Sequence, residues 1–292
     1  MRIVSCLLIA LALLVHGRAA NANEPGCGGD RACTVELGDY LVLTPDGYDG
    51  TQPAPAVIYF HGWQSSAQAA IGASDLVQPF LEAGFLFVAP NGANKTWAHQ
   101  GSPSQARDEI AFMDQVRADL LARFNVDAQR LLVTGFSQGG SMAWDLACQR
   151  GSAYTAFAPV AGAFWRPHPE SCPGGPVALL HIHGFTDGMV PLEGRGIRDG
   201  RWHQGDVFEG MQLLRTTNGC QANADHYDVD GPLRCREWRE SCQSGEPLAL
   251  CLHSGSHVRP KGWHERAMAW LEQNARGGVA RHECAGDAAL TC

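Results

Sequence analysis

The sequence predicts an α/β protein with a mostly parallel central sheet covered by helices on both faces. Short, continuous apolar runs bounded by Gly and Pro alternate along the chain with amphipathic helical patterns. Such runs are typical of parallel strands that are buried on both faces. Their alternation with helices predicts crossover connections that place a helical layer on each side of the sheet. A glycine-rich turn at residues 135–140 joins one of these runs directly to a helix, as this arrangement requires.

The same patterns give the individual elements. Strands are predicted at residues 56–60, 85–89, 131–134 and 177–182, and helices at residues 106–124, 141–148, 207–217 and 264–275. In the first of these helices, apolar residues from Ile110 to Phe124 recur at three- and four-residue steps, so one face is expected to pack on a core. Residues 233–253 are typical of two strands around a turn at 243–246, which predicts a hairpin or a late sheet edge.

The first 22 of the 292 residues have the pattern of a signal peptide. Arg2 precedes an apolar run at residues 3–15, and Ala20-Asn21-Ala22 provides a cleavage site after Ala22. The apolar run is too short for an ordinary membrane span, so no stable membrane anchor is expected. The sequence therefore predicts a secreted or periplasmic protein whose residues 23–292 form a single catalytic domain.

Cysteine usage agrees with export. The chain has 11 Cys, and Cys6 lies within the predicted signal peptide. The ten that remain suit up to five disulfides in an oxidising compartment. Zinc binding is the alternative, because His253 and His257 lie close to Cys251, but no pair of Cys has the C-x₂-C spacing that completes such a site. We expect no metal and no cofactor.

The charge balance excludes one class of partner. The formal net charge is −8, and residues 1–22 contain two Arg and no acid, so their removal makes the balance more negative. An acidic chain argues against nucleic acid as a partner.

Ser137 is the candidate nucleophile. Gly135-Phe136-Ser137-Gln138-Gly139 has the form G-x-S-x-G and lies between a predicted strand and a predicted helix. In this context the serine occupies a strained turn, and the following helix N-terminus favours developing negative charge. The bare motif is common, and an ordinary Gly/Ser turn is the alternative interpretation.

A serine nucleophile needs a base and a carboxylate that orients it. In the α/β-hydrolase fold, these follow the serine in the order acid and then histidine. Asp187 follows the predicted strand at 177–182 and is the candidate acid, although Asp is also common in turns. Histidines after it are His203, His226, His253, His257, His264 and His282. His257 is favoured over His253 because it lies in a Gly/Ser loop just beyond a predicted strand.

The oxyanion of an acyl-transfer intermediate needs two N–H donors. One is expected from the backbone of Gln138, directly after the nucleophile, and the other from Trp63 in the loop after the strand at 56–60. His61 in that loop precedes the nucleophile and the acid in the chain, so we expect it to shape the loop rather than to act as the base.

With these residues in place, the chain resembles the secreted α/β-hydrolase esterases that include polyhydroxybutyrate depolymerase-like proteins and feruloyl or acetylxylan esterases. The resemblance extends from about Gly38 to Leu271. It rests on an ordered set of segments: Tyr59-Phe60-His61-Gly62, residues 126–130, Gly135 to Gly140, Ala158 to Gly162, His183 to Asp187, Asn218-Gly219-Cys220 and Gly255-Ser256-His257. It implies a carboxylic ester hydrolase that uses Ser137, Asp187 and His257 and forms an acyl-enzyme.

Two departures from the family pattern concern the site. The family often has Trp-Pro soon after the histidine, where this chain has Val258-Arg259-Pro260, which puts the shape of the acyl or alcohol pocket in doubt. Gln138 replaces the Ala or Asn that commonly follows the nucleophile, but its backbone N–H is retained.

The resemblance also suggests disulfide pairings. It implies a Cys220–Cys242 bridge, which leaves Cys235 and Cys251 to join the two late strands and support His257. Cys148–Cys172, Cys27–Cys33 and Cys284–Cys292 complete the predicted set.

Substrate contacts are predicted from aromatic residues. Trp63, Trp97, Trp165 and Trp202 fall in predicted loops, and exposed rings there can stack on an acyl group, a sugar or a polyester chain. Trp202, Trp97 and Trp165 are the candidates for substrate binding, with Trp202 favoured; ordinary packing is the alternative for each. The alternatives for the whole chain are a secreted serine peptidase on the same fold and a non-catalytic α/β-hydrolase-like binding protein.

Overall fold

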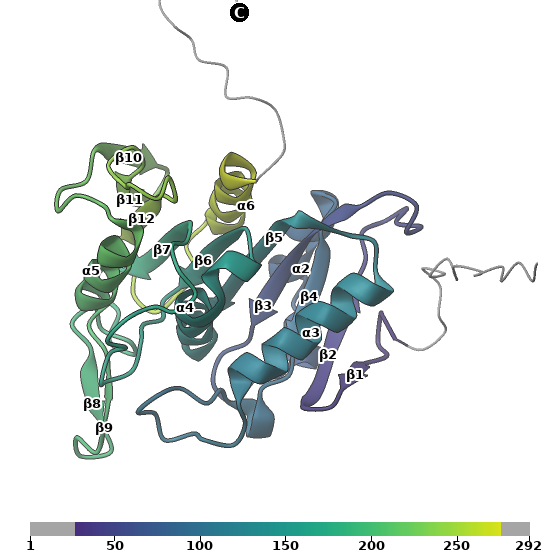
Figure 1. Cartoon of the computed structure of the whole chain (residues 1–292). Coiled ribbons are helices and arrows are strands. Elements are labelled where there is room, and N and C mark those ends of the chain that lie inside the picture. Colours follow the sequence, from purple (N-terminus) through teal and green to yellow (C-terminus); the bar gives the residue numbers. More distant parts are fainter. Residues whose placement is uncertain (1–26, 276–292) are drawn as a thin grey trace, which may run out of the picture.

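A ten-stranded sheet runs through the computed structural model, which describes residues 27–275 (Figure 1). Its strand order is β1-β2-β4-β3-β5-β6-β7-β12-β11-β10. The strands are β1 (Cys33–Val35), β2 (Gly38–Leu43), β3 (Ala54–Phe60), β4 (Leu86–Pro90), β5 (Val126–Phe136), β6 (Ala156–Val160), β7 (Leu179–Gly184), β10 (His226–Asp230), β11 (Leu233–Trp238) and β12 (Leu248–His253). The predicted signal peptide and the predicted Cys284–Cys292 bridge lie outside the described residues.

The centre of the sheet is parallel and both of its edges are antiparallel. Neighbouring strands from β4 through β3, β5, β6 and β7 to β12 all pair in parallel. At the edges, β1 and β2 pair antiparallel, as do β2 and β4, and β10 and β11 continue the sheet antiparallel beyond β12. The predicted α/β-hydrolase fold with a mostly parallel sheet is therefore confirmed.

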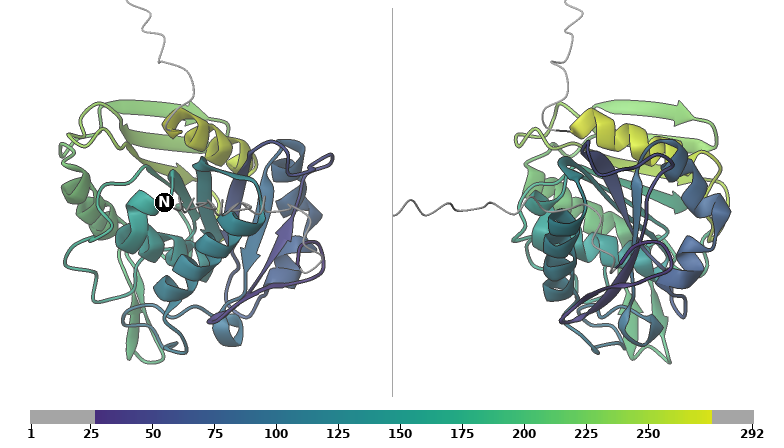
Figure 2. Two further views of the ribbon diagram at one scale, coloured as in Figure 1. Left: turned by 45° about the vertical axis from the view of Figure 1, so that its right-hand side comes forward. Right: turned by 90° about the vertical axis from the view of Figure 1, so that its right-hand side faces the viewer.

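Helices cover both faces of this sheet. The helices are α1 (Ala67–Ile71), α2 (Ser74–Glu82), α3 (Glu109–Arg123), α4 (Gln138–Arg150), α5 (Val207–Asn218) and α6 (Trp263–Asn274). One core cluster packs α3, α4 and α5 on one face of the sheet, and a second packs α1, α2 and α6 on the other. The turned view in Figure 2 shows the two helical layers with the sheet between them.

The apolar runs are continuous because the central strands contribute to both cores. In β3, Ile58 belongs to the core under α3 and α4, whereas Val57 and Tyr59 on either side of it belong to the opposite core. All three are buried. Side chains alternate between the faces of a strand, so a strand buried on both faces needs apolar residues at successive positions.

The predicted helices are present, with shifts at their ends. The first one starts at Glu109 rather than at residue 106, because the Asp108 side chain caps it by accepting a hydrogen bond from the N–H of Ala111 at 3.0 Å. The Asp206 side chain caps α5 in the same way, and Gly219 ends that helix in the left-handed conformation with a φ of 66°.

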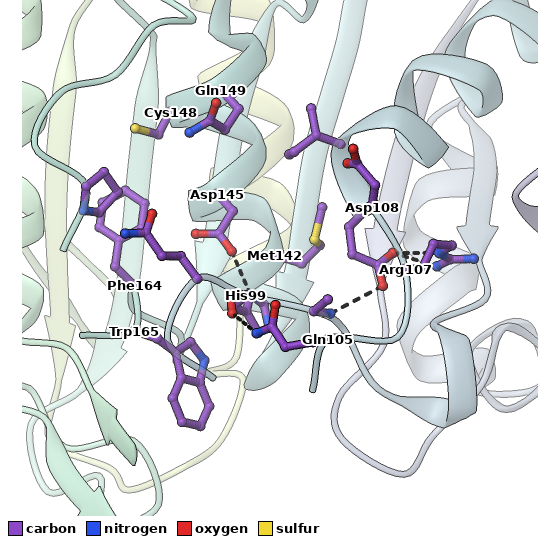
Figure 3. A pocket seen from close by; sticks show the side chains of 15 residues that line it. His99, Gln105, Arg107, Asp108, Met142, Asp145, Cys148, Gln149, Phe164 and Trp165 are labelled. Carbon is purple, nitrogen blue, oxygen red and sulfur yellow. Dashed lines mark hydrogen bonds and ion pairs between the residues drawn. The ribbon is translucent and has the colours of Figure 1, made fainter. Parts of the chain in front are cut away.

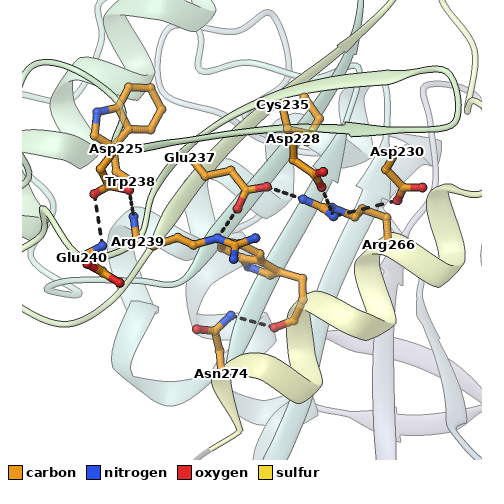
Figure 4. A network of polar contacts seen from close by, with 12 residues as sticks. Asp225, Asp228, Asp230, Cys235, Glu237, Trp238, Arg239, Glu240, Arg266 and Asn274 are labelled. Carbon is orange, nitrogen blue, oxygen red and sulfur yellow. Dashed lines mark hydrogen bonds and ion pairs between the residues drawn. A yellow bond between two sulfur atoms is a disulfide. The ribbon is translucent and has the colours of Figure 1, made fainter. Parts of the chain in front are cut away.

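The late hairpin that the sequence predicted is formed by β11 and β12, and α6 packs beside it. Cys235 on β11 lies opposite Cys251 on β12 and forms a disulfide with it. Arg266 of α6 reaches the buried carboxylate of Glu237 on β11 and also contacts Asp228 on β10 at 2.9 Å (Figure 4). The disulfide and these ion pairs fix the strand that leads into the His257 loop.

Four of the five predicted disulfides are confirmed: Cys27–Cys33, Cys148–Cys172, Cys220–Cys242 and Cys235–Cys251. A separate two-stranded hairpin, β8 (Arg195–Ile197) and β9 (Trp202–Gln204), lies between β7 and α5 along the chain. The sequence analysis did not predict it.

Candidate active site

Ser137 lies in a strained turn at the carboxyl end of β5. The strand ends at Phe136, α4 begins at Gln138, and Ser137 between them has a φ of 60° and a ψ of −123°. A non-glycine residue in this region is held there by its surroundings, and such positions are concentrated at functional sites. The residue is only partly buried, so its hydroxyl can be reached from solvent.

The glycines of the motif are required by close packing of the backbone. A Cβ on Gly139 would lie 2.0 Å from the carbonyl oxygen of Phe60, and one on Gly135 would lie 2.3 Å from the carbonyl oxygen of Gly139. Any side chain at either position would push β5, α4 and β3 apart. The G-x-S-x-G pattern therefore follows from the geometry of the turn.

Asp187 and His257 meet beside this turn. His257 Nδ1 lies 2.7 Å from Asp187 Oδ2, and the His257 ring packs on Phe136 with ring centroids 4.7 Å apart. Since Phe136 directly precedes Ser137, this contact brings the imidazole to the turn that carries Ser137. The structure thus brings together the three residues that the sequence selected, from β5, the loop after β7 and the loop after β12.

Asp187 is buried and has four donors near its carboxylate. Oδ1 accepts hydrogen bonds from the N–H groups of Met189 and Val190 at 2.8 and 2.9 Å, and Oδ2 faces His257 and, at 3.4 Å, His183. Burial alone would raise the pKa of Asp187, but the hydrogen bonds from His183, His257 and Val190 outweigh it and hold this pKa well below its ordinary value. The carboxylate is therefore ionised at neutral pH.

A close backbone approach holds the two loops together. A Cβ on Gly184 would lie 2.1 Å from the carbonyl oxygen of Ser256, and the N–H of Phe185 donates to the carbonyl oxygen of His253 at 2.7 Å. The loop that carries Asp187 and the loop that carries His257 therefore form one packed unit.

The predicted oxyanion donors flank Ser137. A Cβ on Gly62 would lie 3.7 Å from the Ser137 Cβ, so the loop after β3, which includes Trp63, borders the nucleophile. Gln138 is the first residue of α4, where backbone N–H groups have no partner within the helix. Within residues 27–275, neither the Trp63 N–H nor the Gln138 N–H has a hydrogen-bond acceptor. Both amides are free to bind a ligand oxygen.

His61 shapes this loop. Its Nδ1 lies 2.8 Å from the carbonyl oxygen of Gly62, and its Nε2 accepts a hydrogen bond from the N–H of Gly92 at 3.0 Å. The ring is buried, and burial lowers its pKa. Both nitrogens are thus used by the backbone, which agrees with a structural role.

The prediction that Trp97 contacts substrate is wrong. Its side chain is completely buried, and its Nε1–H donates to the carbonyl oxygen of His61 at 2.8 Å. Gln138 is hydrogen-bonded next to Trp97, because its side-chain amide donates to Thr96 Oγ1 at 2.7 Å. Trp97 therefore supports the loop after β3 that carries His61 and Trp63.

The contact of Trp165 with substrate stays a prediction. Only 7% of the residue is exposed, and its ring stacks on His99, which in turn lies 2.6 Å from Asp145. Trp165 lines a cavity of about 210 Å³ along the side of α4 (Figure 3), and none of the three predicted catalytic residues borders it. Trp202 is half-buried on β9 between Arg198 and Arg201, and its contact with substrate stays a prediction.

The comparison with known families decides the class of the protein. The family model described as "Putative esterase" matches residues 39–218, more than half of the chain. The chain belongs to this esterase family.

Two of its relatives are named feruloyl esterases. The esterase is 34% identical over 223 residues to feruloyl esterase C of Emericella nidulans, covering 71% of this chain and 72% of that protein. It is 29% identical over 281 residues to feruloyl esterase D of Neurospora crassa, covering 88% of this chain and 89% of that one. These relatives and the family make the chain a carboxylic ester hydrolase, as the sequence predicted.

Solved structures share the fold of the esterase. An acetyl xylan esterase from Aspergillus awamori matches with a TM-score of 0.60 at 13% identity, covering 80% of this chain and 93% of that one. A thermostable esterase matches with a TM-score of 0.54 at 16% identity, covering 82% and 59%.

The esterase has a second cavity, of about 250 Å³, whose lining includes Phe136, the residue before Ser137. Gly62, Tyr59 and Arg259 also line it. Arg259 donates to the Tyr59 hydroxyl at 3.0 Å and lies over the Phe136 ring at 5.6 Å. Sequence reasoning missed this cavity; the only signal was that Arg259 lies two residues after the predicted base.

Two further findings concern residues 27–275. No group of three or more His, Cys, Asp or Glu side chains in this range could hold a metal ion. None of the helices described there is long and apolar enough to cross a membrane.

Proposed function

We propose that the esterase hydrolyses its substrate through an acyl-enzyme, with Ser137 as nucleophile, His257 as base and Asp187 as the carboxylate that orients the base. The observation that carries the proposal is the 2.7 Å contact between His257 Nδ1 and Asp187 Oδ2 beside the strained turn of Ser137. Asp187 can only accept a hydrogen bond when ionised, so it fixes the imidazole with its proton on Nδ1 and leaves Nε2 free to take a proton.

In the acylation step, the Ser137 oxygen attacks the ester carbonyl carbon while His257 Nε2 takes the hydroxyl proton. The negative charge that develops on the carbonyl oxygen is stabilised by the N–H groups of Trp63 and Gln138. When the intermediate collapses, the bond to the alcohol oxygen breaks, and His257 returns the proton to the departing alcohol.

Deacylation repeats these steps with water as the nucleophile. His257 takes a proton from the water, the hydroxide adds to the acyl carbon, and Ser137 leaves with the proton that His257 returns. The products are the free acid and the regenerated serine. The buried, ionised Asp187 stabilises the imidazolium that forms in both steps.

The substrate that fits the proposal is an ester of an aromatic acid, as in feruloyl esters. The names of the relatives support this choice over a polyhydroxybutyrate oligomer. The second cavity also supports it, because Phe136 and Tyr59 offer aromatic surfaces there and Arg259 offers donors for a distant oxygen on the acyl group.

The esterase is proposed to act outside the cytoplasm, in a secreted or periplasmic setting. Four disulfides join residues of the described chain, and such bonds persist in oxidising compartments. The pattern at residues 1–22 supports the same location.

The test is hydrolysis of methyl ferulate, p-nitrophenyl esters of increasing chain length and hydroxybutyrate oligomers by the wild type and by Ser137→Ala. We expect Ser137→Ala to lose activity on every substrate, and methyl ferulate to give the highest wild-type kcat/KM among the natural-type esters. Ser152→Ala, an exposed serine after α4, is the matched control and should keep full activity. Undiminished hydrolysis by Ser137→Ala would overturn the proposed mechanism, and a preference for hydroxybutyrate oligomers would overturn the proposed substrate.

A further inference from the structure

Two buried histidines connect the nucleophile helix with Asp187. His181 and His183 are two residues apart on β7, so both side chains point to the same face of the sheet, toward α4. Neither has any exposed surface. Burying an imidazole is costly unless its two nitrogens find partners, so the hydrogen bonds of this pair require an explanation.

The partners define one continuous chain of hydrogen bonds. Trp144 Nε1 on α4 lies 3.2 Å from His181 Nδ1, and His181 Nε2 lies 2.8 Å from His183 Nδ1. His183 Nε2 lies 2.7 Å from the carbonyl oxygen of Val190 and 3.4 Å from Asp187 Oδ2. The chain thus begins on the helix that follows Ser137 and ends at the carboxylate that faces His257.

The positions of the protons follow from the two ends of this chain. An indole N–H can only donate, so His181 Nδ1 must accept and carries no proton. The proton of neutral His181 is therefore on Nε2 and is donated to His183 Nδ1. At the other end the carbonyl oxygen of Val190 can only accept, which places the proton of His183 on Nε2.

This arrangement holds Asp187 in two ways. His183 Nε2–H faces the same carboxylate oxygen that accepts the hydrogen bond of His257. It also fixes the carbonyl of Val190, and the N–H of Val190 donates to the other oxygen of Asp187. If His183 carried its proton on Nδ1, its bare Nε2 would face a carbonyl oxygen and a carboxylate, and both contacts would be repulsive.

We propose that His183 is a positioning residue that orients Asp187 for His257, and that Trp144 and His181 set the tautomer in which it does so. The proposal rests on the proposed roles of Asp187 and His257. Trp144, two helical turns after Ser137 on α4, then helps to orient Asp187, although it does not contact Asp187 itself.

The surroundings keep His181 neutral. Burial lowers the pKa of His181 far below its ordinary value, and His183 lowers it further. The titratable groups around His183 are His181 on its own strand, Asp187 and His257 at the site, and His253 at the end of β12, whose pKa burial also lowers. A neutral donor can approach an ionised carboxylate without competing with the charge that His257 acquires during the reaction.

The first measurement is made on the protein without substrate. Long-range nitrogen–proton correlation NMR spectra of isotope-labelled enzyme report which nitrogen of each imidazole carries the proton. We expect Nε2–H on both His181 and His183 in the wild type, and a changed His181 spectrum in Trp144→Phe, which keeps an aromatic ring but loses the indole N–H. A His183 proton on Nδ1, or on both nitrogens at neutral pH, would overturn the proposal.

The second measurement separates positioning from packing by kinetics. His183→Phe removes both nitrogens. We expect it to lower kcat by about tenfold to a hundredfold with KM little changed, because it weakens the positioning of the base and removes only part of the rate that a positioned base supplies. His183→Gln can place an amide N–H near the Nε2 position and should restore most of the loss. Trp144→Phe should lower kcat by about two- to tenfold, as for one neutral hydrogen bond.

Trp270→Phe is the matched control for Trp144→Phe. Trp270 is equally buried on the opposite face, and its Nε1 has no hydrogen-bond partner within the described residues. Trp270→Phe removes the same side-chain volume as Trp144→Phe but no hydrogen bond, so the kcat of this variant should stay at the wild-type level. Equal losses of kcat in Trp144→Phe and Trp270→Phe would overturn the role of the hydrogen-bond chain. This comparison remains valid if His183→Phe does not fold.

Ser137→Ala separates this proposal from the proposed function. An active Ser137→Ala enzyme would overturn the triad itself. A folded His183→Phe enzyme with wild-type kcat, beside an inactive Ser137→Ala enzyme, would overturn only the role of His183.

Discussion

His257 Nδ1 lies 2.7 Å from Asp187 Oδ2, and the other oxygen of the same carboxylate accepts two backbone N–H groups. One side of the carboxylate is thus fixed by the backbone of its own loop, while the other side faces the imidazole. Because these hydrogen bonds keep the carboxylate from rotating, it can hold the imidazole in one orientation, as a Ser-His-Asp mechanism requires.

Replacing the carboxylate by an amide should disable the base while leaving the fold intact. In Asp187→Asn the amide can donate to the imidazole and favours the wrong tautomer, so we expect kcat to fall by about 10⁴-fold, as in serine proteases with the same change. Steady-state kinetics on a p-nitrophenyl ester measure this loss. Asp199→Asn, an exposed aspartate in the β8–β9 hairpin, should retain wild-type kcat. Equal kcat in the two variants would contradict the role of Asp187.

The low pKa of Asp187 predicts a specific pH dependence of stability. Its pKa is depressed in the folded protein, so its contribution is fully present above the unfolded value of about 3.9 and is lost as the pH falls through the folded value. In this range the unfolded chain binds more protons, and stability therefore rises with pH. The difference in unfolding free energy between wild type and Asp187→Asn should be larger at pH 7 than at pH 3, as measured by urea unfolding. A difference that grows toward low pH would contradict the assignment.

The fold could be predicted from the sequence more fully than the site. Continuous apolar runs identified β3, β4, β5 and β7 because strands buried on both faces need such runs. The order of Ser137, Asp187 and His257 followed from the fold. The strands β1, β2 and β10 and the hairpin β8–β9 were missed, because partly exposed strands carry no such signal. The strand β6 was missed although it is buried throughout.

The parts of the site that were missed depend on contacts between distant segments. A loop position says nothing of burial, so Trp97 was predicted to contact substrate although it is completely buried. The second cavity joins Tyr59 and Arg259, which are 200 residues apart. Similarly, the hydrogen-bond partner of His181 Nδ1 is Trp144, 37 residues earlier. No local pattern reports such pairs.

The Cys235–Cys251 disulfide should stabilise both the fold and the site. It closes a loop with a sequence separation of 16, and its removal by Cys235→Ser with Cys251→Ser should lower the free energy of unfolding by about 2–4 kcal/mol. Because β12 leads into the His257 loop, kcat should fall as well. The control is Cys27→Ser with Cys33→Ser, which opens a separation of 6 at the far edge of the sheet. This pair should lose less stability and no kcat; an equal loss of kcat in both pairs would contradict a specific role for the late hairpin.

Arg259 should influence which acyl groups the enzyme accepts. In Arg259→Met the apolar stem is kept, while the donor to the Tyr59 hydroxyl is lost from the cavity wall. We expect KM for methyl ferulate to rise by about tenfold, as for one hydrogen bond from a charged group, with little change for p-nitrophenyl acetate, whose acyl group is too short to reach Arg259. Lys261→Met removes a nearby exposed charge and should change neither value. Equal effects of Arg259→Met on both substrates would show that the cavity does not hold the acyl group.

The central claim is that Ser137 forms the covalent bond to the acyl group, and labelling by a fluorophosphonate tests it most directly. This reagent phosphonylates an activated serine, and peptide mass spectrometry locates the adduct. We expect one adduct, on the peptide that contains Ser137, formed slowly or not at all in His257→Ala and in wild type protected by excess ester. An adduct on another serine that abolishes hydrolysis, or an unlabelled Ser137 in an enzyme that the reagent has inactivated, would contradict it.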